Sequence, residues 1–240
     1  MKAILLLMAV GFTMWAQPAP DVNELVKRTG ERFFALENFD VELKIGLLGD
    51  HPMERRMRLA RREDGSLLHD SKTGYITIVR DGRLIRIRGQ YKEWTETAAE
   101  GPEMRSLKGV FEQQITRFEK LVAVEFEIEF VKWEELKRGS KRVKCAVVRM
   151  WPRRQADGIW KETLWIEPDE ALVWRSLWEE TRVGAGVMST ARQVDYDWRA
   201  TAAPIGDGVF DSEKLKKYRK VDKFTSSAGM GATLPSKVGP

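Results

Sequence analysis

The chain has 240 residues, 42% of them hydrophobic and 10% aromatic, which suffices for one good core and is too little for two comfortable domains. Charged residues of both signs make up 32% of the chain and are interspersed, a composition that excludes a disordered polymer. The formal net charge of +5 would ordinarily raise nucleic acid as a partner.

The first segment predicts export. Lys2 is followed by an apolar run over residues 3–15 and then by small and helix-breaking residues from Ala16 to Pro20. Such a run matches the core of a secretory signal and falls short of the roughly 20 residues that span a bilayer. We expect a signal peptide over residues 1–16, cleaved after Ala16, and a periplasmic protein. An uncleaved anchor is the alternative. Export argues against nucleic acid and favours acidic proteins or anionic membrane surfaces as partners.

A helix is predicted directly after this segment. Asp21 can act as N-cap and Glu24 completes a capping box. Apolar or small side chains then recur at helical spacing and form one stripe, which must pack on something. The stripe consists of Val22, Leu25, Val26, Thr29, Phe33 and Leu36.

The periodicity then changes to two, which is typical of strands with one buried face. Runs of this kind occupy residues 39–47, 53–62, 66–70, 75–80, 83–88 and 91–95, and residues such as Asp81-Gly82 mark tight turns between them. After a second predicted helix over residues 107–121, strands resume at residues 122–130, 142–150, 160–167, 172–182 and 189–198.

Three segments carry a resemblance to a known family. Residues 77–84 form a strand, Asp-Gly turn and strand; residues 164–169 and 172–175 form an aromatic hairpin turning at acidic-Pro; and Asp195-Tyr196 is followed by Phe210. The pattern resembles the periplasmic lipoprotein carriers LolA and LolB and their relative RseB. The basic-Pro pair of the carriers' early strand is missing, since the chain reads His51-Pro52 there, so we expect a divergent member.

The resemblance implies a mainly β (α+β) fold, in which a curved antiparallel sheet forms an incomplete barrel covered by two or more helices. We expect this domain to span residues 21–222, with a flexible tail or linker over residues 223–240. In LolA the enclosed apolar cavity takes lipoprotein acyl chains, whereas in RseB a similar domain senses envelope stress through a partner.

Apolar strand residues are the candidates for lining such a cavity. The alternative is that they simply pack beneath the helices, because large aromatic side chains dominate ordinary cores. The candidate ligand-binding residues are Leu43, Ile45, Ile78, Ile85, Ile87, Trp94, Phe126, Ile128, Trp165, Trp174 and Trp178.

Arginines also recur along strands. Arg56, Arg58 and Arg62 share one face of a strand, and Arg86 and Arg88 alternate with isoleucines on another. If these faces adjoin, they form a positive patch that allows peripheral contact with anionic lipid headgroups or an acidic partner. A solvated outer face of the sheet explains the same alternation.

Signals for catalysis are close to absent. His51, His69 and Cys145 are too few and too scattered for a usual zinc site, and the chain has no phosphate loop or nucleophile elbow. We therefore expect no catalytic residue, no metal, no cofactor and no enzymatic activity. The sequence favours a periplasmic carrier for an acyl chain or another apolar ligand, and the alternative is an envelope protein-interaction or stress-sensing module of RseB type.

Overall fold

The computed structural model describes residues 18–49, 52–122, 126–138, 141–153, 159–183, 187–201, 204–211, 215 and 217–224. The predicted signal peptide, its cleavage site and residues 225–240 of the predicted tail lie outside these ranges.

The described strands form one open, bent sheet. They are β1 (Phe39–Leu48), β2 (Met53–Arg61), β3 (Leu67–Asp70), β4 (Tyr75–Arg80), β5 (Arg83–Arg88), β6 (Glu93–Ala98), β7 (Phe126–Arg138), β8 (Lys141–Pro152), β9 (Ile159–Glu167), β10 (Leu172–Val183), β11 (Val187–Ala200) and β12 (Arg219–Lys220).

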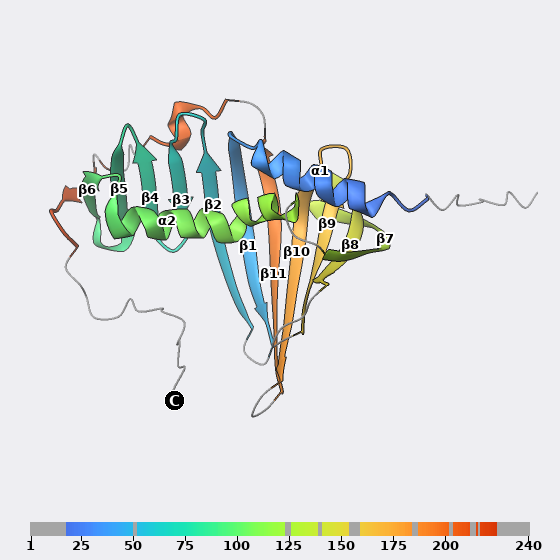
Figure 1. Cartoon of the computed structure of the whole chain (residues 1–240). Coiled ribbons are helices and arrows are strands. Elements are labelled where there is room, and N and C mark those ends of the chain that lie inside the picture. The colour runs from blue at the N-terminus through green and yellow to red at the C-terminus, as the bar shows by residue number, and fades with distance from the viewer. Residues whose placement is uncertain are drawn as a thin grey trace, which may run out of the picture.

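This 12-stranded sheet has the order β12-β6-β5-β4-β3-β2-β1-β11-β10-β9-β8-β7. Its pairs are antiparallel apart from the parallel pair of β12 and β6. Since β12 and β7 lie at opposite ends of the order, the sheet does not close into a barrel. Figure 1 shows it curved beneath the helices. The predicted fold class, a mainly β incomplete barrel covered by helices, is confirmed.

Helices lie across the concave face, the face of the sheet against which they pack (Figure 1). They are α1 (Val22–Phe34), α2 (Gly101–Gln114) and the 3-10 helix η2 (Thr116–Val122). The short 3-10 turns η1 (Gly89–Tyr91) and η3 (Asp207–Val209) complete the helical elements described. The opposite face is called the convex face below.

Turn and cap signals in the sequence identified several boundaries. The Asp21 carboxylate accepts hydrogen bonds from the backbone N–H of Asn23 and of Glu24, both at 3.1 Å, so the predicted N-cap of α1 is confirmed. Asp81 and Gly82 have φ values of 51° and 70°, the left-handed pair that a type I′ hairpin turn between β4 and β5 requires.

The second helix differs from its prediction. It begins at Gly101 rather than near residue 107, because Pro102 occupies the first turn, where a helix needs no backbone N–H donor. The α-helical hydrogen bonds end at Ile115, and the chain continues as η2. The predicted helix over residues 107–121 is thus two segments, and the following strand starts at Phe126 instead of residue 122.

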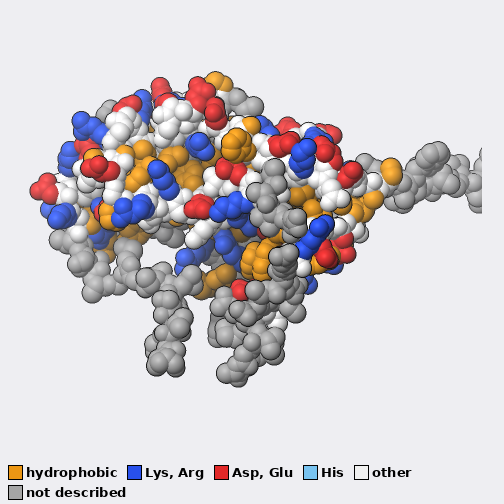
Figure 2. All heavy atoms as spheres, viewed as in Figure 1, with side chains coloured by type: hydrophobic (Ala, Val, Ile, Leu, Met, Phe, Trp, Pro, Cys, Tyr) orange, Lys and Arg blue, Asp and Glu red, His pale blue; other side chains and the backbone are white. Residues whose placement is uncertain are grey.

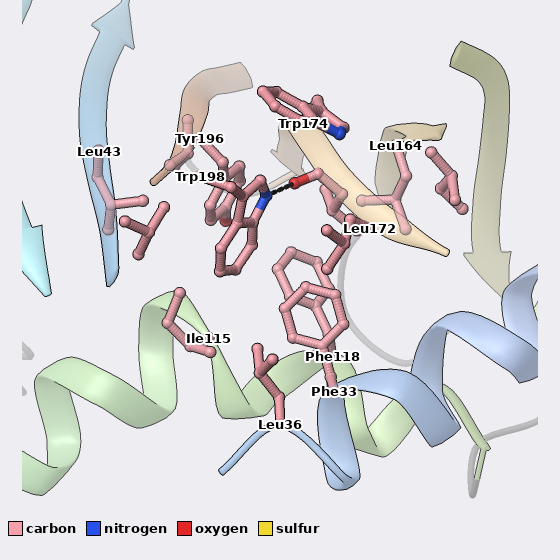
Figure 3. Close-up of a cluster of buried hydrophobic side chains, with 14 of the residues drawn as sticks. Phe33, Leu36, Leu43, Ile115, Phe118, Leu164, Leu172, Trp174, Tyr196 and Trp198 are labelled. Carbon is pink, nitrogen blue, oxygen red and sulfur yellow. Dashed lines mark hydrogen bonds between the residues drawn. The ribbon is translucent and has the colours of Figure 1, made fainter. Parts of the chain in front are cut away.

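The main core lies between the helices and the concave face. Phe33 of α1 packs against Phe118 of η2, with ring centroids 4.8 Å apart, and against Trp198 of β11 at 5.8 Å. The Trp198 indole donates a 2.8 Å hydrogen bond to the carbonyl of Val173. Figure 3 shows these rings facing one another between the helices and the strands. Buried aromatic rings thus hold α1 and η2 against the centre of the sheet.

A smaller core lies on the convex face. Ala60, Leu68 and Ile78 of β2, β3 and β4 are buried there under Ile205 and Phe210. The Arg62 guanidinium lies 5.3 Å from the Phe210 ring centroid and pairs with Asp207 at 2.5 Å. The segment of residues 204–211 therefore covers the convex face of these strands.

Adjacent phenylalanines at the end of α1 provide a test of this core. Phe33 is 2% exposed and Phe34 is 78% exposed. Phe33→Ala should lower the free energy of unfolding by about 3–5 kcal/mol, and the matched control Phe34→Ala by less than about 0.5 kcal/mol. Urea denaturation followed by tryptophan fluorescence measures both. Equal losses for the two variants would contradict the described packing of α1.

Candidate ligand-binding surface

The register of the sheet assigns each predicted ligand residue to a face, because directly opposed residues of antiparallel strands lie on the same side. Leu43 and Ile45 oppose Tyr196 and Val194 of β11, which belong to the main core. From the seam between β1 and β11, the strand pairs continue outward across the sheet. They place one group of the candidates on the concave face: Leu43, Ile45, Phe126, Ile128 and Trp178.

The other candidates lie elsewhere. Trp165 opposes Arg175 on the convex face, and Trp174 occupies an irregularity in the pairing of β10 with β9. A group on β4, β5 and β6 faces the smaller convex core or its continuation toward β12: Ile78, Ile85, Ile87 and Trp94. The structure thus divides the candidates between the two faces of the sheet, and a contact of any of them with ligand stays a prediction.

Burial falls along the concave face away from the helices. The row of Val194, Ser176 and Leu164, beneath the helices, is buried. In the next row, Trp178 is half-buried, and toward the hairpin between β1 and β2 Leu47 is 41% exposed and its neighbour Met53 is 46% exposed. Large apolar side chains therefore continue along the concave face beyond the part that the helices cover, with Arg192 between Leu47 and Trp178.

This surface is called the concave strip. Its central part is an aromatic wall, in which Trp160 and Trp178 stack with ring centroids 4.5 Å apart at 15°. Phe126 meets Trp160 edge-on at 6.1 Å. The strip consists of Leu47, Met53, Phe126, Ile128, Trp160 and Trp178, each half-buried or exposed.

Sequence reasoning did not select Leu47, Met53 and Trp160 as ligand residues. For Leu47 a usable signal existed, because it continues the period of two of Leu43 and Ile45 along one strand. Met53 and Trp160 join the same face through the pairing of their strands.

A polar network connects the strip to the helices. Arg117 of η2 donates to the Glu162 carboxylate at 2.6 Å and to the Ser176 hydroxyl at 2.9 Å. The Tyr196 hydroxyl donates to the carbonyl of Gln114 at 3.2 Å. Arg192 of β11 donates to the side-chain oxygen of Gln114 at 2.6 Å. The network therefore ties the C-terminal end of α2 and the start of η2 to three strands.

The two arginines of this network have different electrostatic surroundings. Burial works to lower the pKa of Arg117, but the Glu162 carboxylate, only 8% exposed, raises it above the usual arginine value on balance. Burial and then the positive charge of Arg117 leave the pKa of Arg192 below its usual value. The Glu162 carboxylate thus pairs with Arg117, while Arg192 has the neutral side chain of Gln114 as its hydrogen-bond acceptor.

The single positive patch predicted from the strand arginines is wrong. Arg58 lies on the convex face and pairs with Asp40 at 2.6 Å. Arg86 lies on the concave face, 3.5 Å from Glu103 of α2. The two sets of arginines are on opposite faces because the strands between them keep a strict period of two from the seam outward.

A separate cleft of about 630 Å³ opens where the β7–β8 hairpin approaches the turn after β9. Trp133 and Trp174 contribute to its wall, and charged residues of both signs, such as Lys144 and Glu167, contribute to its rim. Because charged side chains of both signs contribute to this lining, we regard the concave strip as the candidate site for an apolar ligand.

Two further observations limit the chemistry of the described residues. No three side chains of the types that bind metal ions gather anywhere in this part of the chain. The thiol of Cys145 is buried, and burial raises its pKa to about 12, so the reactive thiolate form is suppressed.

Among the described helices, none combines the length and apolarity needed to cross a bilayer.

No protein-family model matches the chain, and no curated protein matches it. Solved structures do. LprF from Mycobacterium bovis is 11% identical, with 79% of this chain and 98% of that chain covered and a TM-score of 0.45. The MucA/MucB complex from Pseudomonas aeruginosa matches at 15% identity over 81% of this chain, with a TM-score of 0.44.

A LolA superfamily protein from Nitrosomonas europaea matches at 11% identity over 82% of this chain and 100% of that chain, with a TM-score of 0.31. In the MucA/MucB complex the present chain spans 62% of the chain it matches. A member of the LolA superfamily, the group that the sequence resembles, is therefore among the matched structures.

The polar network leads to a prediction about stability. Arg117→Met should cost about 3–5 kcal/mol in the free energy of unfolding, because it leaves Glu162 buried without its partner. Adding Glu162→Gln should recover part of this loss. In the matched exposed pair of Lys120 and Glu112, Lys120→Met should cost less than about 0.5 kcal/mol. Urea denaturation gives all the values, and strictly additive losses for Arg117 and Glu162 would argue against the described pair.

Proposed function

We propose that this chain is an exported carrier or binding module that holds an acyl chain or another apolar ligand along the concave strip, in the manner of outer-membrane lipoprotein sorting. The observation that carries the proposal is the continuation of the core surface beyond the helices. Apolar side chains that belong to the same face as the core are half-buried or exposed there.

Physical considerations favour an apolar ligand. An exposed set of large apolar side chains is costly in water and marks an interaction surface. Each methylene group buried against it contributes about 0.8 kcal/mol, so even a short alkyl chain gains appreciable binding energy. The stacked rings of Trp160 and Trp178 provide a rigid wall, which loses little conformational entropy when a ligand binds.

The proposal includes the organisation of the chain. Residues 1–16 would act as a signal peptide directing the protein to the periplasm, residues 21–222 as the binding domain, and residues 223–240 as a flexible tail or linker. Binding without catalysis agrees with the isolated and buried Cys145 thiol. No metal or cofactor is invoked for it.

A second candidate function is recognition of an envelope protein, as in a stress-sensing module of RseB type. The observation that favours it is the position of β7 at the end of the sheet, where among the described residues it pairs only with β8. An unpaired strand edge is a template for an added strand of another protein. Val131 of β7 is 38% exposed.

Native mass spectrometry of protein purified from cells, followed by titration with a fluorescent apolar probe, tests the carrier proposal. We expect a retained species of lipid-like mass and probe binding that Trp178→Ala weakens about tenfold, through the loss of ring contacts worth roughly 1.4 kcal/mol. Trp151→Ala is the matched control, because Trp151 is a half-buried tryptophan on the convex face, paired with Glu127. It should leave probe binding unchanged.

The same preparation separates the two candidates. A protein without retained lipid, with no measurable probe affinity, would refute the carrier proposal. Recovery of a stoichiometric protein partner that is lost on Val131→Asp, with lipid absent, would support recognition at the β7 edge instead.

A further inference from the structure

We propose that Arg192, with Arg117 behind it, binds the anionic head of an amphiphile whose alkyl chain lies on the concave strip. This inference rests on the proposed function and adds a polar specificity to it. The head group would be a carboxylate or a phosphate, the two anionic oxygen groups that a guanidinium recognises through paired hydrogen bonds.

The position of Arg192 relative to the strip is the first argument. Arg192 opposes Leu47 of β1 on one side and Trp178 of β10 on the other. It is half-buried and points to the concave face, since its guanidinium reaches Gln114 of α2. A chain that lies along the aromatic wall therefore has this guanidinium next to it, and in Figure 2 basic and apolar side chains are exposed side by side below α2.

The charge balance is the second argument. Glu162 pairs with Arg117, whereas the hydrogen bond of Arg192 goes to the neutral side-chain oxygen of Gln114. A guanidinium has five N–H donors, and Nη2 is the nitrogen of Arg192 for which a partner is found among the described residues. The charge of Arg192 is thus partly desolvated, with no carboxylate hydrogen-bonded to it among the described residues, a situation that a bound anion would relieve.

Arg117 strengthens the preference for an anion, because it adds a second positive charge near Arg192. Its guanidinium donates to Ser176 and Glu162, and its buried Nε has no hydrogen-bond partner in the described part of the chain. Gln114 links the two arginines, because Arg192 contacts its side chain while the hydroxyl of Tyr196, 3.5 Å from Arg117, contacts its carbonyl. Arg117, paired with Glu162, and Arg192, bonded to Gln114, thus bring two guanidinium groups to the boundary between buried and exposed apolar surface.

The surface on either side of Arg192 would accommodate an apolar tail of modest length. Leu47 and Met53 extend the strip on one side of Arg192, and Trp178 and Trp160 on the other. A head group at Arg192 would leave a tail in contact with one of these surfaces. The site therefore fits an amphiphile better than it fits either a neutral hydrocarbon or a free anion.

Displacement of the neutral probe N-phenyl-1-naphthylamine by dodecanoate, dodecyl phosphate and dodecanol tests the inference with the full chain. The three ligands share one alkyl chain and differ in the head. We expect the wild-type protein to prefer at least one anionic ligand over dodecanol by about tenfold, the gain from one charge-assisted hydrogen-bonded pair. The better of the two anionic ligands identifies the head group as carboxylate or phosphate.

Variants assign the preference to Arg192. Arg192→Gln should bring the ratio of affinities close to one while leaving the affinity for dodecanol within about twofold. Arg192→Lys should keep part of the preference, because it retains the charge and loses the paired geometry. Arg199→Gln is the matched control: it removes an arginine from the same strand, which lies on the convex face and pairs with Glu42, and the ratio should not change.

The outcomes separate this inference from the proposed function. Absence of displacement by all three ligands would refute the carrier proposal and the inference together. Equal affinities of dodecanol and both anionic ligands for the wild-type protein, or a preference that survives in a folded Arg192→Gln variant, would overturn the inference alone. The wild-type comparison needs no variant, so the test stands even if Arg192→Gln fails to fold.

Discussion

The pairing of β1 with β11 is the interaction on which the structure depends. It joins a strand near the start of the chain to one near the end, with Leu43 opposite Tyr196 and Ile45 opposite Val194. Strands β2 to β6 extend from one side of this seam, and β10 to β7 from the other. Because side chains alternate along a strand outside irregularities such as the one at Trp174, the register at the seam largely determines which residues of the other strands face the helices.

Helices α1 and η2 pack against the large aromatic side chains of β11. Phe33 of α1 and Phe118 of η2 meet Trp198 and Tyr196 of β11. The same strand then carries Arg192, which reaches the end of α2. One strand thus provides both the anchor of the helical layer and the polar boundary below it, so that core packing and the candidate site are consequences of a single register.

The boundary between covered and uncovered sheet explains why the two proposals concern the same place. Above it, rings and aliphatic groups are buried; below it, the same face continues with Trp178, Leu47 and Met53 at increasing exposure. Polar side chains at such a boundary are costly to bury unless they are paired. Arg117 has a carboxylate partner, whereas the partner described for Arg192 is an amide oxygen, so the boundary combines apolar surface with an arginine that has no carboxylate bonded to it among the described residues.

Local signals in the sequence identified the first helix and the alternating strands, and a family resemblance indicated the class of the fold. Capping at Asp21, the left-handed turn at Asp81-Gly82 and the change of period after the first helix are local signals, and local backbone energetics decide them. Only the tertiary structure decided which strand faces look at the helices. The face that a strand residue occupies depends on the long-range register of β1 with β11, for which neighbouring residues carry no information. For this reason Trp165 and Ile78 lie on the face opposite to Trp178. For the same reason Arg58 and Arg86 do not form one patch. The network of Arg117, Glu162 and Arg192 likewise joins η2, β9 and β11, segments that meet only when the sheet has formed.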